Sequence, residues 1–135
     1  MRSIFWILAV TLLLGQSCHG LVREEKIIGD FYLVAVDSET ETSLSFKISD
    51  GSYIGIVPAT VYSAGYDSKY VYAKQHPEGA NGKTNYYIIP IKVKDQYRVD
   101  EEVIGPLNKT QFTEKLYELG VTKSEDLFQI TIDNL

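Results

Sequence analysis

Residues 60–93 have the sequence TVYSAGYDSKYVYAKQHPEGANGKTNYYIIPIKV. This stretch is central to the predicted fold, and the segments before and after it are considered in relation to it. Three apolar and aromatic runs, at 61–66, 69–75 and 85–93, are separated by segments rich in Asp, Gly, Asn and Pro. Such runs are typical of β-strands, and such separators are typical of turns. The stretch therefore predicts an antiparallel meander. Pro90 predicts an edge strand or a bulge, because proline cannot donate to a strand ladder.

The segments before the meander predict further strands. Residues 27–36 are apolar at both alternating sets of positions, which is typical of one central strand covered on both faces. Residues 43–48 alternate between polar and apolar, which indicates a half-exposed strand. Asp50-Gly51 separates this strand from another at 53–57, and this dipeptide is a strong signal for a hairpin turn.

The segment after the meander predicts a helix. Residues 94–105 are charged and irregular. Asn108 fits the N-cap of a helix, and Gln111 follows three residues later, as in a capping box. Apolar side chains at 112, 116 and 119 then form a narrow stripe, and residues 127–132 are typical of a short strand.

These elements predict the fold class. We expect a mainly β protein of the α+β type, built as an antiparallel meander sheet or as a small sandwich or half-barrel. One C-terminal helix packs on the sheet, and a short last strand follows it.

The N-terminus predicts export. Arg2 precedes the apolar run 4–14, and small residues precede Cys18, the only cysteine of the chain. This is the form of a secretory signal peptide, here residues 1–17, and the run is shorter than the roughly 20 apolar residues of a membrane-spanning helix. Two outcomes remain open. Cys18 carries a lipid that anchors the protein to a membrane of the cell envelope, or cleavage after Ser17 or Gly20 releases a soluble secreted or periplasmic protein.

The domain organisation follows from this processing. Residues 18–26 are polar and charged, so we expect the lipid-attachment cysteine and a tether there. Residues 27–135 then form a single β-rich domain.

Composition argues against several functions. The chain carries 13 basic and 18 acidic residues, a net charge of −5, which disfavours nucleic-acid binding. A single cysteine excludes an intramolecular disulfide and a four-cysteine zinc site. Neither a nucleophile elbow nor a glycine-rich phosphate loop is present, so we expect no cofactor and no metal.

Tyrosines of the meander are the candidate binding surface. The strand period places Tyr70 and Tyr72 on one face, and it places Tyr62 and Tyr66 together on the neighbouring strand. Tyr86 extends this group. Exposed rings of this kind bind a glycan, a peptide or a partner protein, whereas the alternative is that they form half of a sheet core.

His76 and Glu78 are the only arrangement that favours catalysis. His76 opens a loop rich in proline and glycine, where a general base can act, and Glu78 lies two residues further on. The alternative is an ordinary loop histidine at the end of a strand.

Five segments together resemble a known family. They are Gly29-Asp30-Phe31-Tyr32-Leu33, Gly51-Ser52-Tyr53-Ile54-Gly55, Lys74-Gln75-His76-Pro77, Asn85-Tyr86-Tyr87-Ile88-Ile89-Pro90 and Gly105-Pro106-Leu107. In order and spacing they are similar to a family of small bacterial lipoproteins of unknown function. The resemblance implies an envelope location and a single small domain, and it supplies no catalytic residues.

We therefore expect a non-catalytic lipoprotein of the bacterial envelope. Its β-rich domain binds an unidentified protein or glycan in the periplasm or at the cell surface, and Cys18 links it to the membrane. One alternative is a secreted inhibitor or immunity-type protein that binds a basic partner through its acidic surface. The other alternative is a small enzyme with a site near His76.

Overall fold

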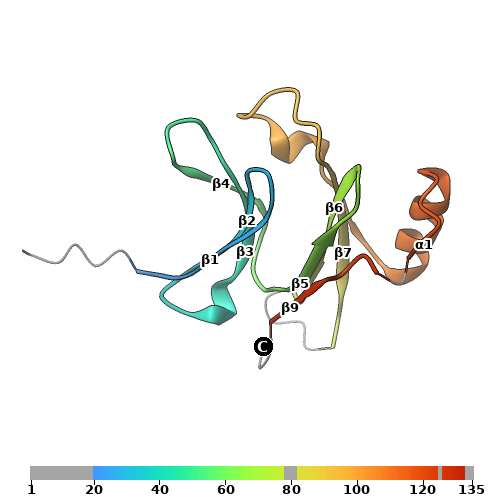
Figure 1. Cartoon of the computed structure of the whole chain (residues 1–135). Coiled ribbons are helices and arrows are strands. Elements are labelled where there is room, and N and C mark those ends of the chain that lie inside the picture. The colour runs from blue at the N-terminus through green and yellow to red at the C-terminus, as the bar shows by residue number, and fades with distance from the viewer. Residues whose placement is uncertain (1–19, 78–81, 125, 133–135) are drawn as a thin grey trace, which may run out of the picture.

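The computed structural model describes residues 20–77, 82–124 and 126–132, which form two antiparallel sheets and a helix (Figure 1). The first sheet, called sheet A, has the strand order β1-β2-β3-β4. Its strands are β1 (Leu21–Ile28), β2 (Phe31–Val36), β3 (Ser43–Lys47) and β4 (Tyr53–Val57). A short 3-10 helix, η1 (Glu39–Glu41), links β2 to β3.

The second sheet, called sheet B, has the order β8-β7-β6-β5-β9 and contains the predicted meander. Its strands are β5 (Val61–Tyr66), β6 (Tyr70–Gln75), β7 (Asn85–Pro90), β8 (Ile104–Leu107) and β9 (Ile130–Thr131). The helices are the 3-10 helix η2 (Val99–Glu102) and α1 (Lys109–Glu118). The predicted class is confirmed: the chain is mainly β, with one C-terminal α-helix and a short last strand.

Sheet B lies between sheet A and α1, so its two faces belong to two cores (Figure 1). The first core fills the space between the sheets and includes Leu33, Leu44, Val61, Val71 and Ile89, all of which are fully buried. The second core lies under α1 and the C-terminal segment, and its buried members are Tyr72, Ile88, Phe112, Leu116 and Leu127. The meander is therefore the central layer of the molecule.

A buried polar cluster joins the two sheets. Gln75 donates from Nε2 to the Pro58 carbonyl at 2.8 Å, in the link between β4 and β5. Its Oε1 accepts from the Asn85 amide and from the Tyr87 hydroxyl, both at 3.0 Å. Because each of these groups is hydrogen-bonded, the sheet-to-sheet link is fixed without the cost of an unpaired buried polar atom.

The prediction of one strand over residues 27–36 is wrong. This region contains the turn of a hairpin, in which Ile28 of β1 pairs with Phe31 of β2. Gly29 adopts a positive φ of 58°, and Asp30 completes the two-residue turn. Gly-Asp is a known hairpin dipeptide, but the continuous apolar run around it concealed the turn.

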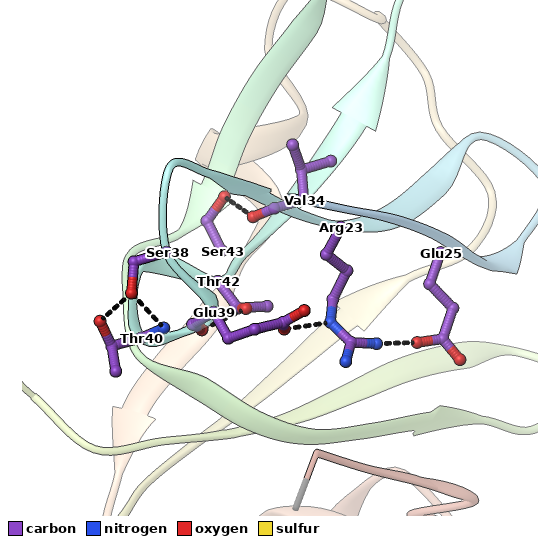
Figure 2. A network of polar contacts seen from close by, with 8 residues as sticks. All are labelled: Arg23, Glu25, Val34, Ser38, Glu39, Thr40, Thr42 and Ser43. Carbon is purple, nitrogen blue, oxygen red and sulfur yellow. Dashed lines mark hydrogen bonds and ion pairs between the residues drawn. The ribbon is translucent and has the colours of Figure 1, made fainter. Parts of the chain in front are cut away.

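The predicted tether is also wrong for residues 21–26, which belong to strand β1. Arg23 pairs with a carboxylate of η1 and with one of its own strand: it donates to Glu39 at 2.7 Å and to Glu25 at 2.5 Å (Figure 2). Charged side chains are common on edge strands, because they discourage pairing with other chains. The charge run therefore indicated an edge strand rather than a free linker. Cys18 lies outside the described residues.

Further elements confirm or correct individual predictions. The turn at Asp50-Gly51 is confirmed, and Gly51 has φ 89° within a longer loop. By contrast, β7 is not an edge strand, since β6 and β8 flank it. Pro90 is its last residue, and the register shift of the strand lies between Tyr86 and Ile88 instead.

Helix α1 forms as predicted. Asn108 Oδ1 accepts a hydrogen bond from the backbone N–H of Gln111 at 2.8 Å, and Gln111 Oε1 accepts one from the backbone N–H of Asn108 at 2.9 Å. This capping box fixes the start of the helix, and Phe112 and Leu116 form its buried face. Within the described ranges, no helix has the length and apolarity needed to cross a membrane.

Candidate functional site

The structure separates the five candidate tyrosines into different environments. Tyr72 is fully buried in the second core, and its hydroxyl donates to Asp67 Oδ2 at 2.6 Å. Tyr70 and Tyr86 are half-buried and pack against the same core. Tyr66 lies at the end of β5 with 39% of its surface exposed. Tyr70, Tyr72 and Tyr86 therefore form one group under α1, to which Tyr62 and Tyr66 do not belong.

Tyr62 instead stacks on His76. Their ring centroids are 4.0 Å apart, and the ring planes differ by 7°. His76 Nδ1 lies 3.0 Å from the Lys83 carbonyl, which can only accept, so this hydrogen bond requires a proton on Nδ1. Glu78, the second residue of the predicted pair, lies outside the described residues.

A groove between α1 and sheet B is the candidate binding site, and it has a volume of about 430 Å³. Its apolar wall consists of Leu116 and three aromatic rings. Tyr86 and Phe112 stack with centroids 4.7 Å apart, and Phe128 lies 5.9 Å from Phe112 and 6.3 Å from Tyr86. A site of this size, with convergent aromatic and polar groups, is typical of those that hold a small molecule.

Lysine and hydroxyl groups complete the groove. Lys74 from β6 holds its ammonium 4.4 Å from the centroid of Phe128 and 5.8 Å from that of Tyr86. Lys109, at the start of α1, also lines the groove. The lining hydroxyl groups come from β5, α1, the following segment and β9, and belong to Ser63, Thr113, Ser124 and Thr131.

Sequence reasoning found only Tyr86 of this groove. The strand period places Lys74 on the same face as Tyr70 and Tyr72, so this lysine had a detectable signal. Phe128 had none, because its position depends on how the C-terminal segment returns over sheet B. The apolar stripe of α1 predicted that Phe112 packs on the sheet, but it did not predict that the helix leaves an open groove there.

A second cluster lies on sheet A, and sequence reasoning missed it. Tyr32 and Tyr53 meet edge to face at 5.5 Å, and the Lys47 ammonium lies 5.5 Å and 5.6 Å from their rings. The Tyr53 hydroxyl donates to Glu24 at 2.5 Å. Burial, together with this hydrogen bond to a carboxylate, raises the pKa of Tyr53. Because the cation and the hydroxyl already have partners, the cluster is well explained as a stabilising surface network.

A pocket of about 590 Å³ adjoins this cluster at the end of sheet A. Tyr32 and Lys47 line it together with Asp30, and loop residues including Gln96 close its other side. Its lining thus carries both a cation and a carboxylate. In the described part of the chain, no group of three or more His, Cys, Asp or Glu side chains is arranged to hold a metal ion.

Comparison with known proteins identifies the family. A family model described as a protein of unknown function (DUF3997) matches residues 28–131. The match extends from the end of β1 to β9, so it covers both sheets, α1 and the groove. No curated protein and no solved structure matches the chain. The protein belongs to this uncharacterised family, which agrees with the predicted resemblance to a family of unknown function.

Proposed function

We propose that this member of the DUF3997 family is a lipid-anchored protein of the bacterial envelope that acts by binding a ligand rather than by catalysis. The observation that carries the binding part is the groove between α1 and sheet B, where aromatic, cationic and hydroxyl groups from separate elements converge on one space. The anchoring part is supported by the leader at residues 1–17 and by Cys18 directly after it.

The beginning of the folded domain is consistent with an anchor at Cys18. The Gly20 carbonyl accepts a hydrogen bond from the Asp37 amide at 2.6 Å, directly before β1 begins at Leu21. Cleavage after Gly20 would remove this acceptor, whereas cleavage before Cys18 keeps it. The domain therefore favours the earlier cut, which lipid attachment requires and which release after Ser17 shares.

The state of the polar groups supports binding over catalysis. Every buried side-chain nitrogen and oxygen of the described residues has a hydrogen-bond partner. The enzyme alternative would use Nε2 of His76, whose ring is held by Tyr62 and by the Lys83 carbonyl. This arrangement explains His76 as a structural residue directly after β6.

The anchor can be tested by measuring the intact mass of the mature protein, purified from the membranes and from the supernatant of a bacterial host. In the membrane fraction, we expect the mass of residues 18–135 plus one diacylglyceryl group and one acyl group. We expect Cys18→Ser to abolish this processing. An unmodified mass from cleavage after Ser17 or Gly20 would contradict the anchor. The protein would then be secreted, and the inhibitor alternative, with salt-dependent capture of a basic partner, would replace the proposal.

A further inference from the structure

We propose that the ligand of the groove between α1 and sheet B is a small organic anion that carries a planar apolar ring. This inference rests on the proposed binding function and names the chemical class of its ligand. The features that carry it are the charge of the groove lining, the position of its lysines and the shape of its aromatic wall.

The lining of the groove is cationic although the protein is acidic. The chain has a net charge of −5, yet among the described residues that line the groove the two charged side chains are lysines, Lys74 and Lys109. Among the ion pairs of the described residues, none involves either lysine. No described acidic side chain therefore neutralises either ammonium group, and the net negative charge of the chain disfavours anion binding elsewhere.

Lys74 is positioned at the aromatic wall rather than in open solvent. Its ammonium faces the Phe128 ring at 4.4 Å, and its side chain is half-buried. A cation held against aromatic rings is partly stripped of water, which strengthens its attraction to an anion. Lys109 contributes a second charge from the first turn of α1.

The aromatic wall determines the second half of the ligand. Phe112 is buried beneath Tyr86, so the half-buried rings of Tyr86 and Phe128 present the apolar surface beside the lysines. Aromatic side chains pack favourably against a planar ring, by stacking or by edge contact. The Ser63 and Thr113 hydroxyls donate to the Ile130 and Lys109 carbonyls, so the Thr131 hydroxyl is the one of these three that can donate to the polar end.

The test compares two probes that differ in their charge. 8-Anilinonaphthalene-1-sulfonate is a ringed anion, and N-phenyl-1-naphthylamine has the same rings without the sulfonate. Both are titrated into the full mature chain, and binding is located by amide shifts in ¹H–¹⁵N spectra. We expect the sulfonate to shift groove residues such as Thr113 and to bind about tenfold more tightly, since charge-assisted contacts are the stronger ones.

The decisive variant is Lys74→Met, which keeps the apolar stem of the lysine and removes its charge. We expect it to weaken sulfonate binding about tenfold without changing the affinity for the neutral probe. The matched control, Lys92→Met, removes an exposed lysine outside the groove and should change neither affinity. If Lys74→Met loses the dispersed spectrum of the folded protein, Lys74→Gln makes the same comparison.

Two results would overturn the inference, and they have different meanings. Equal affinity for both probes, or an unchanged sulfonate affinity in Lys74→Met, would show a groove that binds rings without preference for an anion. The proposed binding function would then stand. If the amide shifts lie outside the groove, or if neither probe binds, both the inference and the binding role of the groove are overturned.

Discussion

At the level of single residues, Asp67 shows how one carboxylate organises a turn of sheet B. It accepts hydrogen bonds from the backbone amides of Lys69 and Tyr70, both at 2.8 Å, and from the buried Tyr72 hydroxyl. Partial burial opposes ionisation of Asp67, but the Tyr72 and backbone hydrogen bonds outweigh it and lower the pKa. A carboxylate with a lowered pKa in the folded state stabilises the fold only while it is ionised.

The pH dependence of stability follows from this shift. The contribution of Asp67 is fully present above the unfolded-state pKa of about 4 and is lost as the pH falls through the lower folded-state pKa. We expect Asp67→Asn to lower the free energy of unfolding by about 1 kcal/mol at pH 7 and by much less near pH 3. Urea unfolding at several pH values measures this. Glu114→Gln, at an exposed site on α1, is the control, and a pH-independent cost of Asp67→Asn would contradict the assignment.

The candidate site shows what sequence reasoning can find at single positions. The alternation of side chains along a strand correctly placed Tyr70 and Tyr72 on one face of β6. It could not place Tyr86 with this pair and apart from Tyr62 and Tyr66, because that depends on how β7 pairs with β6. It could not tell that α1 and the C-terminal segment cover Tyr72, since burial depends on what packs above the face. For the same reason Phe128 was missed, although it completes the aromatic wall of the groove.

Among the elements, the C-terminal segment depends on a close approach to β5. A Cβ atom added to Gly65 would overlap the Leu127 carbonyl oxygen and would lie 2.8 Å from the Gln129 backbone nitrogen. Gln129 also bonds Tyr66 through both ends of its side-chain amide, each at 2.9 Å. The absence of a side chain at Gly65 therefore allows this segment, which carries Phe128, to lie flat on sheet B.

We expect Gly65→Ala to lower the free energy of unfolding by about 2–3 kcal/mol, the usual cost of overpacking in a tight site. It should also speed hydrogen exchange at Ile130 and Ile132, whose strand pairing depends on the seated segment. Gly55→Ala is the matched control, because Gly55 lies in β4 with open space around its α-carbon. Equal effects of the two substitutions on stability and exchange would refute the close-packing argument.

The elements differ in how well the sequence predicted them, and the reason is physical. The helix start was predictable because the Asn108–Gln111 capping box is made entirely of local contacts. Strand β1 was missed because an edge strand with paired charges has the composition of a linker. The strand β8 was also missed: Gly105-Pro106 suggests a break, yet β8 pairs with β7 through a register shift.

For the whole molecule, strand β1 changes how an anchor at Cys18 would hold the domain. If residues 18–26 were a free tether, the folded domain could lie roughly 30 Å from the membrane. Because the domain already begins at Leu21, the linking chain spans only about 10 Å when fully extended. The end of β1 nearest the anchor also exposes apolar side chains: Leu21, Val22 and, on β2, Val36 are exposed by 38%, 49% and 47%. A lipidated protein would therefore hold this end of β1 against the bilayer, with α1 on the far side of sheet B (Figure 1).

This orientation can be measured with a tryptophan reporter, since the one tryptophan of the chain, Trp6, lies in the proposed leader, residues 1–17. We expect the fluorescence of lipidated Val22→Trp, in vesicles that contain brominated lipids, to be quenched at least about twofold, because the side chain enters the interfacial region where tryptophan is stable. Tyr117→Trp, at an 88% exposed site on α1, should show little quenching in the same vesicles. Equal quenching of both variants would mean that the domain tumbles freely around its anchor. Strong quenching of Tyr117→Trp alone would mean that the groove side, and not the β1 edge, faces the lipid.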